Sequence, residues 1–398
     1  MALKIGRGAE APPFLVMDVI AAANARAAAL PPGAFPDGQG VIRMEVGQPG
    51  TGAPRGAAEA ALRALSSGAA LGYTEAFGNP SLRARIARHY AERYGVEVAP
   101  ARIAVTVGAS GAFPLAFLAA FDRGDRVALA APCYPPYANI LTALGMVPLL
   151  LPCGPQTRYQ PTVAMLAALD PPPAGLILAS PSNPTGTMIP PADFAALAAW
   201  CAANGVRLIS DEIYHGLTYG GVAETTAATL PGAVVINSFS KYFSMTGWRI
   251  GWMVLPEDLI RPVERLAQNL FISPPHIAQV AAEAAFDCLP ELEENRARYR
   301  RNRDLLLREL PRAGLPTPAE ADGAFYLWFD IGPLLAAGVA QDSLAFCSAL
   351  LERAGIAATP GVDFDPARGG RFLRLSYCGP EEAIAAAPAR FAAFLSGR

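Results

Sequence analysis

Residues 238–252 read Ser-Phe-Ser-Lys-Tyr-Phe-Ser-Met-Thr-Gly-Trp-Arg-Ile-Gly-Trp, and the rest of the chain is organised around this stretch. Its centre, Lys241, is one of only two lysines among the 32 basic residues; the other is Lys4, close to the N-terminus. A lysine can lose its proton and attack a carbonyl carbon, whereas an arginine stays protonated. A lysine five positions after the apolar run 233–236 therefore indicates imine chemistry, with an ordinary surface lysine as the alternative.

The composition describes a globular protein of 398 residues, 52% hydrophobic and 17% charged, which is long enough for two domains. Its net charge of −2 gives no reason to expect nucleic acid or a membrane surface as a partner. No apolar run is long enough to predict a membrane span, and Pro12 and Pro13 interrupt the one faint signal-peptide pattern, so we expect a cytoplasmic protein. The six cysteines and three histidines lack metal-ligand spacing, which predicts reduced thiols and no metal site.

From residue 103 onward, apolar strands alternate with helices, which predicts an α/β fold with a mainly parallel sheet covered by helices. The strands expected in this sheet are 103–107, 126–130, 147–151, 175–179, 206–210, 233–237 and 249–255. The helices expected around it are 55–67, 80–94, 111–121, 136–145, 161–169, 191–204, 257–270 and 275–288.

After residue 256 the pattern changes and predicts a smaller α+β domain, completed by the N-terminal segment. We therefore expect a large domain at 48–285, and a small domain made of 1–47 and 286–398. The strands expected in the small domain are 41–46, 324–330, 355–359 and 371–376, and its helices are 14–29, 290–310, 342–353 and 380–395.

Polar clusters follow the expected strands at their carboxyl ends, where parallel sheets bind ligands. Ala109 and Ser110 open a helix after strand 103–107, which favours anion binding, although a glycine turn with a serine cap is an equal alternative. Tyr134 lies between prolines, so its ring could stack on a flat heterocycle or simply fill a loop. Asn183 also lies between two prolines, where its amide could donate to a phenolate or carboxylate oxygen, or only form a tight turn.

Asp211 ends the buried strand 206–210, where a carboxylate needs a cationic partner such as a pyridinium nitrogen. Tyr214, three positions later, could hydrogen-bond an oxygen on the same ring. In the stretch around Lys241, the hydroxyls of Ser238 and Ser240 and the guanidinium of Arg249 suit a phosphate dianion. Arg374, on an apolar strand, suits a substrate α-carboxylate, with an internal salt bridge as the alternative.

Three segments together, 180–186, 210–214 and 240–251, resemble the class I/II aminotransferases, the fold-type-I pyridoxal-phosphate-dependent enzymes. The resemblance covers nearly the whole chain and is greatest to the bacterial aspartate and aromatic aminotransferase branch. It implies pyridoxal 5'-phosphate as the cofactor, held in an internal aldimine on Lys241. It also implies transfer of an amino group from an amino acid to a 2-oxo acid such as 2-oxoglutarate.

The resemblance further implies a role for each of the motif residues. Lys241, Asp211 and Tyr214 would be catalytic, and Arg374 would bind the substrate α-carboxylate with help from Gly47 and Asn183. The implied cofactor contacts are Ala109, Ser110, Tyr134, Asn183, Asp211, Tyr214, Ser238, Ser240, Lys241 and Arg249, with Tyr73 supplied by the partner subunit of a homodimer.

One departure from the family pattern bears on the substrate. Similar aspartate-specific enzymes carry a lysine at the position of Ser110, where it contacts the side-chain carboxylate of the substrate. Its absence predicts a neutral donor, apolar or aromatic, and Phe14, Leu15 and Phe271 match segments that border the substrate side chain.

Other functions account for the same residues less well, or share them. An aspartate aminotransferase, or a β-lyase acting on cystathionine or cysteine conjugates, would share the cofactor motifs. A catalytically inactive regulatory module is disfavoured because Lys241, Asp211 and Arg374 are all present. A Rossmann dehydrogenase is excluded because no GxGxxG motif follows the first strand.

Overall fold

The computed structural model describes residues 3–31, 33–38 and 40–397, and its centre is a sheet of seven strands in the order β2-β8-β7-β6-β5-β3-β4. Only β8 runs antiparallel to its neighbours, β2 and β7, so the mainly parallel sheet predicted from the sequence is confirmed. The strands are β2 (Ile103–Thr106), β3 (Arg126–Ala131), β4 (Val147–Pro152), β5 (Gly175–Ala179), β6 (Arg207–Asp211), β7 (Val234–Ser238) and β8 (Gly251–Val254).

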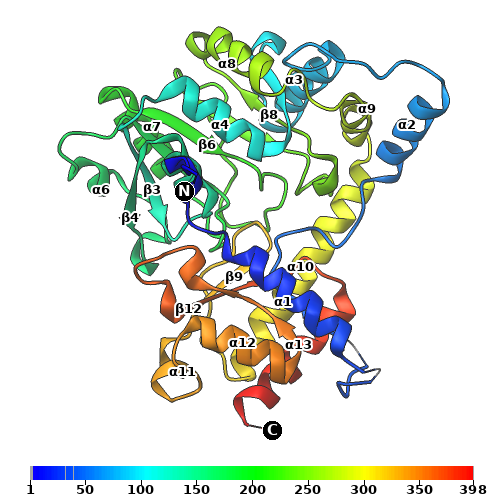
Figure 1. The fold of residues 1–398 in the computed structure, drawn as a ribbon, viewed down its shortest axis with the longest axis vertical. Coiled ribbons are helices and arrows are strands. Elements are labelled where there is room, and N and C mark those ends of the chain that lie inside the picture. The colour runs from blue at the N-terminus through cyan, green and yellow to red at the C-terminus, as the bar shows by residue number, and fades with distance from the viewer. Residues whose placement is uncertain (1–2, 32, 39, 398) are drawn as a thin grey trace.

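Helices pack around this large sheet (Figure 1). Every residue of β2, β7 and β8 is buried, as expected for apolar strands that helices cover on both faces. The helices are α2 (Arg55–Ser66), α3 (Pro80–Tyr94), α4 (Gly108–Ala120), α5 (Pro136–Leu144), α6 (Val163–Ala167), α7 (Pro191–Ala203), α8 (Glu257–Leu270) and α9 (His276–Ala285).

A second, small sheet is antiparallel and has the order β11-β12-β9 (Thr359–Pro360, Phe372–Ser376 and Tyr326–Asp330). It lies at the opposite end of the molecule from α8, and the long helix α10 (Leu289–Arg312) joins the two parts (Figure 1). The remaining elements of this part are β1 (Ile42–Arg43), β10 (Ile356–Ala357), α1 (Leu15–Ala29), α11 (Gly332–Ala336), α12 (Ser343–Ala354) and α13 (Glu381–Leu395).

The domain bounds, 48–285 and 1–47 with 286–398, stay a prediction, and so does the cytoplasmic location. None of the helices in the described ranges is both long and apolar enough to cross a membrane.

Several elements differ from the sequence-based prediction. The strand expected at 41–46 is limited to β1, because the backbone beyond it turns to the small sheet, where the Met44 carbonyl accepts from the Ser376 amide at 2.7 Å and the Glu45 carbonyl from Thr359 Oγ1 at 2.8 Å. The single strand expected at 355–359 is two short strands, β10 and β11, which belong to different sheets. Helix α4 begins at Gly108, three residues before the predicted start, because Gly108 adopts a φ of 66° that turns the chain directly out of β2.

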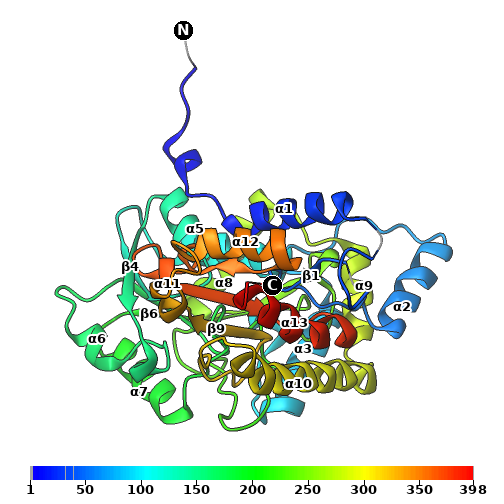
Figure 2. The same ribbon diagram turned by 90° about the horizontal axis from the view of Figure 1, so that it is seen from below.

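Helix α1 is held by a side chain far away in the sequence. Its first two amides, those of Leu15 and Val16, donate to the two carboxylate oxygens of Asp363 at 2.9 and 3.1 Å. Phe14 at its N-cap position offers no capping oxygen, so the carboxylate of Asp363 does this work. The segment that precedes α1 extends from the body of the molecule (Figure 2) and touches α5, where the Pro12 carbonyl oxygen accepts from Asn139 Nδ2 at 3.2 Å, whereas Asp363 holds the first turn of the helix itself.

Replacing Asp363 with Ala should therefore loosen α1. We expect a loss of about 1–2 kcal/mol in the free energy of unfolding, because one buried and one partly buried amide lose a charged acceptor. Hydrogen–deuterium exchange should become faster at the start of α1. Asp342→Ala is the matched control, since Asp342 accepts from Ala345 N at 2.9 Å and caps α12 in the ordinary way. The control should lose similar stability without faster exchange in α1; unchanged exchange in the Asp363 variant would contradict this role.

Candidate active site

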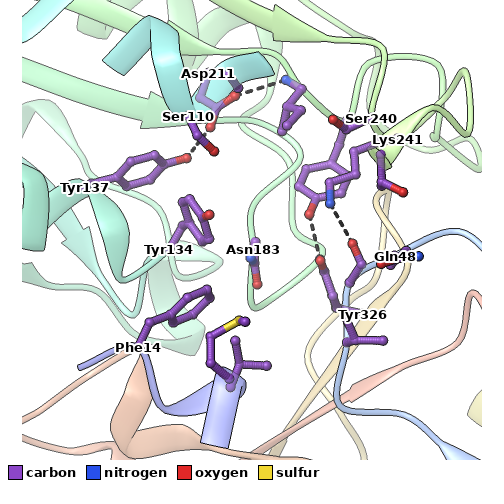
Figure 3. A pocket seen from close by; sticks show the side chains of 18 of the residues that line it. Phe14, Gln48, Ser110, Tyr134, Tyr137, Asn183, Asp211, Ser240, Lys241 and Tyr326 are labelled. Atoms are coloured by element: carbon purple, nitrogen blue, oxygen red, sulfur yellow. Dashed lines mark hydrogen bonds between the residues drawn. The ribbon is translucent and has the colours of Figure 1, made fainter. Parts of the chain in front are cut away.

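A cavity of about 660 Å³ lies beyond the carboxyl ends of β5 and β6, between the large sheet and the small sheet (Figure 3). Most of the residues predicted from the sequence line it: Phe14, Gly47, Ala109, Ser110, Tyr134, Asn183, Asp211, Tyr214, Ser240, Lys241, Arg249 and Arg374. Four do not: Leu15, Tyr73, Ser238 and Phe271.

Lys241 stands three residues beyond the end of β7, and its side chain points into the cavity (Figure 3). The Nζ atom donates to the Gly47 carbonyl oxygen at 2.6 Å and lies 5.9 Å from the centroid of the Tyr214 ring. Burial lowers the pKa of the Lys241 amine to about 8, helped by the nearby Arg374 and Arg249 cations. An appreciable fraction of the amine is therefore neutral, and nucleophilic, at a mildly alkaline pH.

Asp211 is the last residue of β6 and is only 3% exposed. Its carboxylate accepts from the Tyr137 hydroxyl and, at 3.1 Å, from the Ile213 amide. Burial raises the pKa of Asp211 to about 6, although both hydrogen bonds act in the opposite direction. Among the residues the structure describes, no basic side chain forms an ion pair with it, so the carboxylate could accept a cation from within the cavity.

Arg249 and the start of α4 together form an anion site. The guanidinium of Arg249 lies against Gly108, where an added Cβ would come within 2.5 Å of Nη2. The amides of the first turn of α4, which includes Ala109 and Ser110, receive no side-chain cap. Free amides and a guanidinium together suit a phosphate group.

Ser240 and Ser238 play different parts in this corner of the cavity. Ser240 lines the cavity, and its hydroxyl lies 2.9 Å from that of Ser238. Ser238 lies behind it, where its hydroxyl also contacts the Ile250 carbonyl oxygen at 3.1 Å and accepts from the Ser240 amide. Ser238 thus braces the turn that carries Ser240.

Arg374 is 2% exposed, and its guanidinium donates to oxygens that carry no net charge. Nη1 donates to Asn183 Oδ1 at 2.9 Å, and Nη2 donates to the Glu45 carbonyl oxygen and, at 3.1 Å, to Thr359 Oγ1. Within the described part of the chain no carboxylate forms an ion pair with Arg374, and its Nε is buried without a hydrogen-bond partner. The salt bridge considered from the sequence is therefore not formed, and the cation is left to bind a carboxylate.

Two tyrosines of the cavity were not singled out from the sequence. Tyr137 of α5 holds Asp211, and the Tyr326 hydroxyl at the start of β9 lies 2.7 Å from that of Tyr214. A side chain at Gly47 would overlap the Tyr326 hydroxyl, so this glycine allows the close approach. The proline-rich run that includes Tyr134 also contains Tyr137, but nothing in the sequence indicated which ring would reach Asp211.

The wall of the cavity opposite Lys241 is apolar and comes from the start of α1. Phe14 meets Tyr134 edge to face, with ring centroids 5.7 Å apart. Val16, Met17 and Ile20 continue this wall and were not predicted, whereas Leu15 does not line the cavity. The predicted residue Phe271 lies outside it and is partly exposed.

Tyr73 is 83% exposed and does not reach the cavity of its own chain. Its predicted contact across a subunit interface stays a prediction. Among the described residues no group of three or more His, Cys, Asp or Glu side chains could hold a metal ion.

Comparison with known proteins agrees with this geometry. A family model described as aminotransferase class I and II matches residues 39–391. The chain belongs to this family. It is 49% identical over 396 residues to the valine–pyruvate aminotransferase of Mycobacterium tuberculosis, with 98% of each chain covered. It is 33% identical to the aspartate aminotransferase of Geobacillus stearothermophilus, over 91% of this chain and 93% of the relative.

A solved structure supports the same assignment. The crystal structure of an aminotransferase from Mycobacterium tuberculosis superposes with a TM-score of 0.94 at 48% identity, and each chain is covered completely. The family resemblance drawn from residues 180–186, 210–214 and 240–251 is thus confirmed, as is the enzyme class, a transferase of amino groups. The relatives include enzymes named for valine and for aspartate, so family membership alone leaves the substrate of this aminotransferase open.

Because Asp211 is buried, we expect the protein without a bound ligand to become more stable when the negative charge of this carboxylate is removed. Folding raises the pKa of Asp211 from 3.8 to about 6. Above pH 6 the ionised carboxylate therefore lowers the free energy of unfolding by about 3 kcal/mol, and this penalty disappears near pH 4. Cofactor-free Asp211→Asn should therefore be more stable than the wild type at pH 7.5 and equal to it near pH 4, measured by urea unfolding.

The same variant should lose about 100-fold or more of its transaminase activity, because Asn carries no charge toward a cation in the cavity. Asp193→Asn is the control, since Asp193 is exposed on α7 and its substitution should change stability by less than about 0.5 kcal/mol at either pH. A loss of stability in the Asp211 variant at pH 7.5 would show that the carboxylate is satisfied without a ligand.

Proposed function

We propose that this aminotransferase binds pyridoxal 5'-phosphate in the cavity and moves an amino group from a neutral, apolar amino acid to a short 2-oxo acid such as pyruvate. The observation that carries the proposal is the set of cations that line the cavity. In the described ranges these are Lys241, Arg249 and Arg374, and each has a separate task. Arg249 suits the phosphate, Arg374 suits one carboxylate, and Lys241 suits the carbonyl, so none is left for a second substrate carboxylate.

The cavity fits the cofactor at each of its polar groups. The phosphate would lie at the start of α4 beside Arg249 and Ser240, where free amides and a guanidinium come together. Asp211, buried without a basic partner, would bind the protonated ring nitrogen. Asn183 and Tyr214 would hold the ring oxygen, and Tyr134 would lie against the ring.

When bound, the cofactor supplies an aldehyde that condenses with amines and a ring that takes up electrons from the bond broken at Cα. The protein then has to hold and move protons. The Lys241 amine, with its pKa of about 8, can take the proton from Cα of the donor amino acid. In the second half of the reaction it can return a proton to Cα of the acceptor. Arg374 orients the substrate by its carboxylate, because its Nε is buried and still lacks a partner.

The side chain of the substrate would face the wall made by Phe14, Val16, Met17 and Ile20. This wall offers apolar surface and no charge, which favours an aliphatic donor over aspartate. The similarity to an enzyme named valine–pyruvate aminotransferase supports the same choice. The same similarity favours pyruvate as the acceptor. The family resemblance alone leads us to expect 2-oxoglutarate instead.

A homodimer in the cytoplasm, with Tyr73 of one protomer completing the phosphate site of the other, is part of the proposal. Tyr73 is exposed in the single chain, and so are Leu62 and Leu65 of the neighbouring helix α2. Large exposed apolar side chains are typical of an interface between subunits, and these lie close to Tyr73, which the proposal places in the site of the other protomer.

The covalent role of Lys241 can be tested with an absorbance spectrum. Purified protein loaded with pyridoxal 5'-phosphate should absorb at about 410–430 nm, and borohydride should fix the cofactor on Lys241. Lys241→Arg should keep the charge, lose the fixed cofactor and lose nearly all turnover, because a guanidinium does not act as the nucleophile. Near-normal turnover in that variant, or no absorbance after loading, would overturn the proposal. Release of ammonia and pyruvate from cystathionine without an acceptor would indicate β-elimination instead.

The acceptor preference can be changed by adding a cation to the apolar wall. Met17→Arg should raise the ratio of kcat/KM for 2-oxoglutarate to that for pyruvate by roughly 3- to 10-fold, as expected for one partly exposed ion pair. Met17→Gln is the matched control, since it adds polarity without charge and should leave the ratio close to that of the wild type. A wild-type enzyme that already prefers 2-oxoglutarate to pyruvate would show that the acceptor is assigned wrongly.

A further inference from the structure

The two tyrosine hydroxyls at the edge of the cavity form a pair that the reaction described above does not yet use. The hydroxyls of Tyr214 and Tyr326 are 2.7 Å apart, and either oxygen can be the donor. Both side chains are buried, and within the described residues neither hydroxyl has another hydrogen-bond partner. Tyr214 follows β6, whereas Tyr326 begins β9 of the small sheet, so the bond joins the two parts of the molecule.

Tyr326 is held in place on several sides. Its hydroxyl lies against the backbone at Gly47, where any side chain would overlap it. The guanidinium of Arg374 lies 4.5 Å from the centroid of its ring, and the Tyr214 ring meets it edge to face at 5.7 Å. A hydroxyl fixed in this way keeps one direction toward its neighbour, which is the geometry that positions a proton.

The number of protons then decides the direction of the bond. Each hydroxyl carries one proton and can accept through its lone pairs. If Tyr214 donates its proton to the ring oxygen of the cofactor, the proton between the two tyrosines has to come from Tyr326. The order of donation is then Tyr326 to Tyr214 to the ring oxygen.

We propose that Tyr326 is a positioning residue that acts through Tyr214, by donating to it and so strengthening the hydrogen bond from Tyr214 to the ring oxygen of the bound cofactor. The proposal rests on the proposed function, since it requires pyridoxal 5'-phosphate in the cavity. A hydroxyl that accepts a hydrogen bond becomes a better donor, by about 10–30% per bond in a chain. Tyr326 therefore stabilises the deprotonated form of the cofactor chromophore, in which the ring oxygen carries more negative charge.

Other charged and titratable groups also surround the pair. Lys241 lies 5.9 Å from the Tyr214 ring, Arg374 lies over Tyr326, and the other titratable neighbours are the Cys378 thiol and the Tyr134 hydroxyl, whose pKa values burial raises. Burial raises the pKa of Tyr326 to about 12 and that of Tyr214 well above its ordinary value. Both tyrosines therefore keep their protons throughout the pH range in which the chromophore titrates.

The test is a pH titration of the absorbance of the protein loaded with pyridoxal 5'-phosphate. Tyr326→Phe keeps the ring under Arg374 and removes only the hydroxyl. Weaker donation to the ring oxygen favours the protonated chromophore, so the midpoint of the absorbance change should move to higher pH by about 0.2–0.6 pH unit. Tyr214→Phe, which removes the direct donor, should move it further in the same direction.

The double variant separates a relay from a simple packing effect. If Tyr326 acts through Tyr214, then Tyr326→Phe should cause no additional shift in a protein that already carries Tyr214→Phe. The matched control is Tyr219→Phe, which removes another buried tyrosine hydroxyl, one that donates to the Ala324 carbonyl oxygen and lies outside the cavity. It should leave the midpoint unchanged.

The outcomes of these titrations are distinguishable. An unchanged midpoint in Tyr326→Phe, or shifts that add in the double variant, would overturn the relay while the chromophore itself still forms. A protein that shows no cofactor absorbance at all would overturn the proposed function instead. A shift in Tyr326→Phe that disappears in the Tyr214→Phe background supports the relay.

Discussion

The burial of charge at the end of β6 is the constraint on which the rest of the active site depends. The Asp211 carboxylate leaves water when the sheet forms, and the hydroxyl of Tyr137 and the amide of Ile213 replace only part of its hydration. Arg374 presents the opposite case, a buried cation whose Nε has no partner. The cavity therefore presents separated charges of both signs, which a ligand with a basic ring nitrogen and a carboxylate would neutralise.

Close packing of the backbone brings these charges to one place. At Gly47 and Gly108 the absence of a side chain allows the Tyr326 hydroxyl and the Arg249 guanidinium to lie directly against the main chain. The backbone at Gly47 also takes part in the site, because its carbonyl oxygen accepts a hydrogen bond from the Lys241 amine. A larger residue at either glycine would therefore move a functional group as well as a loop.

Much of this arrangement could be predicted because it follows from local patterns. Apolar runs of strand length between helices predicted the large sheet, and the motif residues stood at strand ends, where side chains meet at one edge of a parallel sheet. The cavity residues that the sequence did not single out include Tyr137, Tyr326, Val16, Met17 and Ile20. Their roles depend on packing between segments that the sequence does not place together, as do the bracing position of Ser238 and the positions of Leu15 and Phe271 outside the cavity.

The sequence by itself determined the chemical groups and the alternation of strands and helices, because both depend on residue type and on spacing along the chain. A lone mid-chain lysine, an acid at a strand end and an arginine among apolar neighbours are visible without any fold. Only the tertiary structure decided which groups meet. Lys241 contacts Gly47 across 194 positions, and Arg374 contacts Asn183 across 191, because the small sheet folds back over the carboxyl end of the large one. Such distant contacts are set by packing and by the need to satisfy buried charges, which no local pattern records.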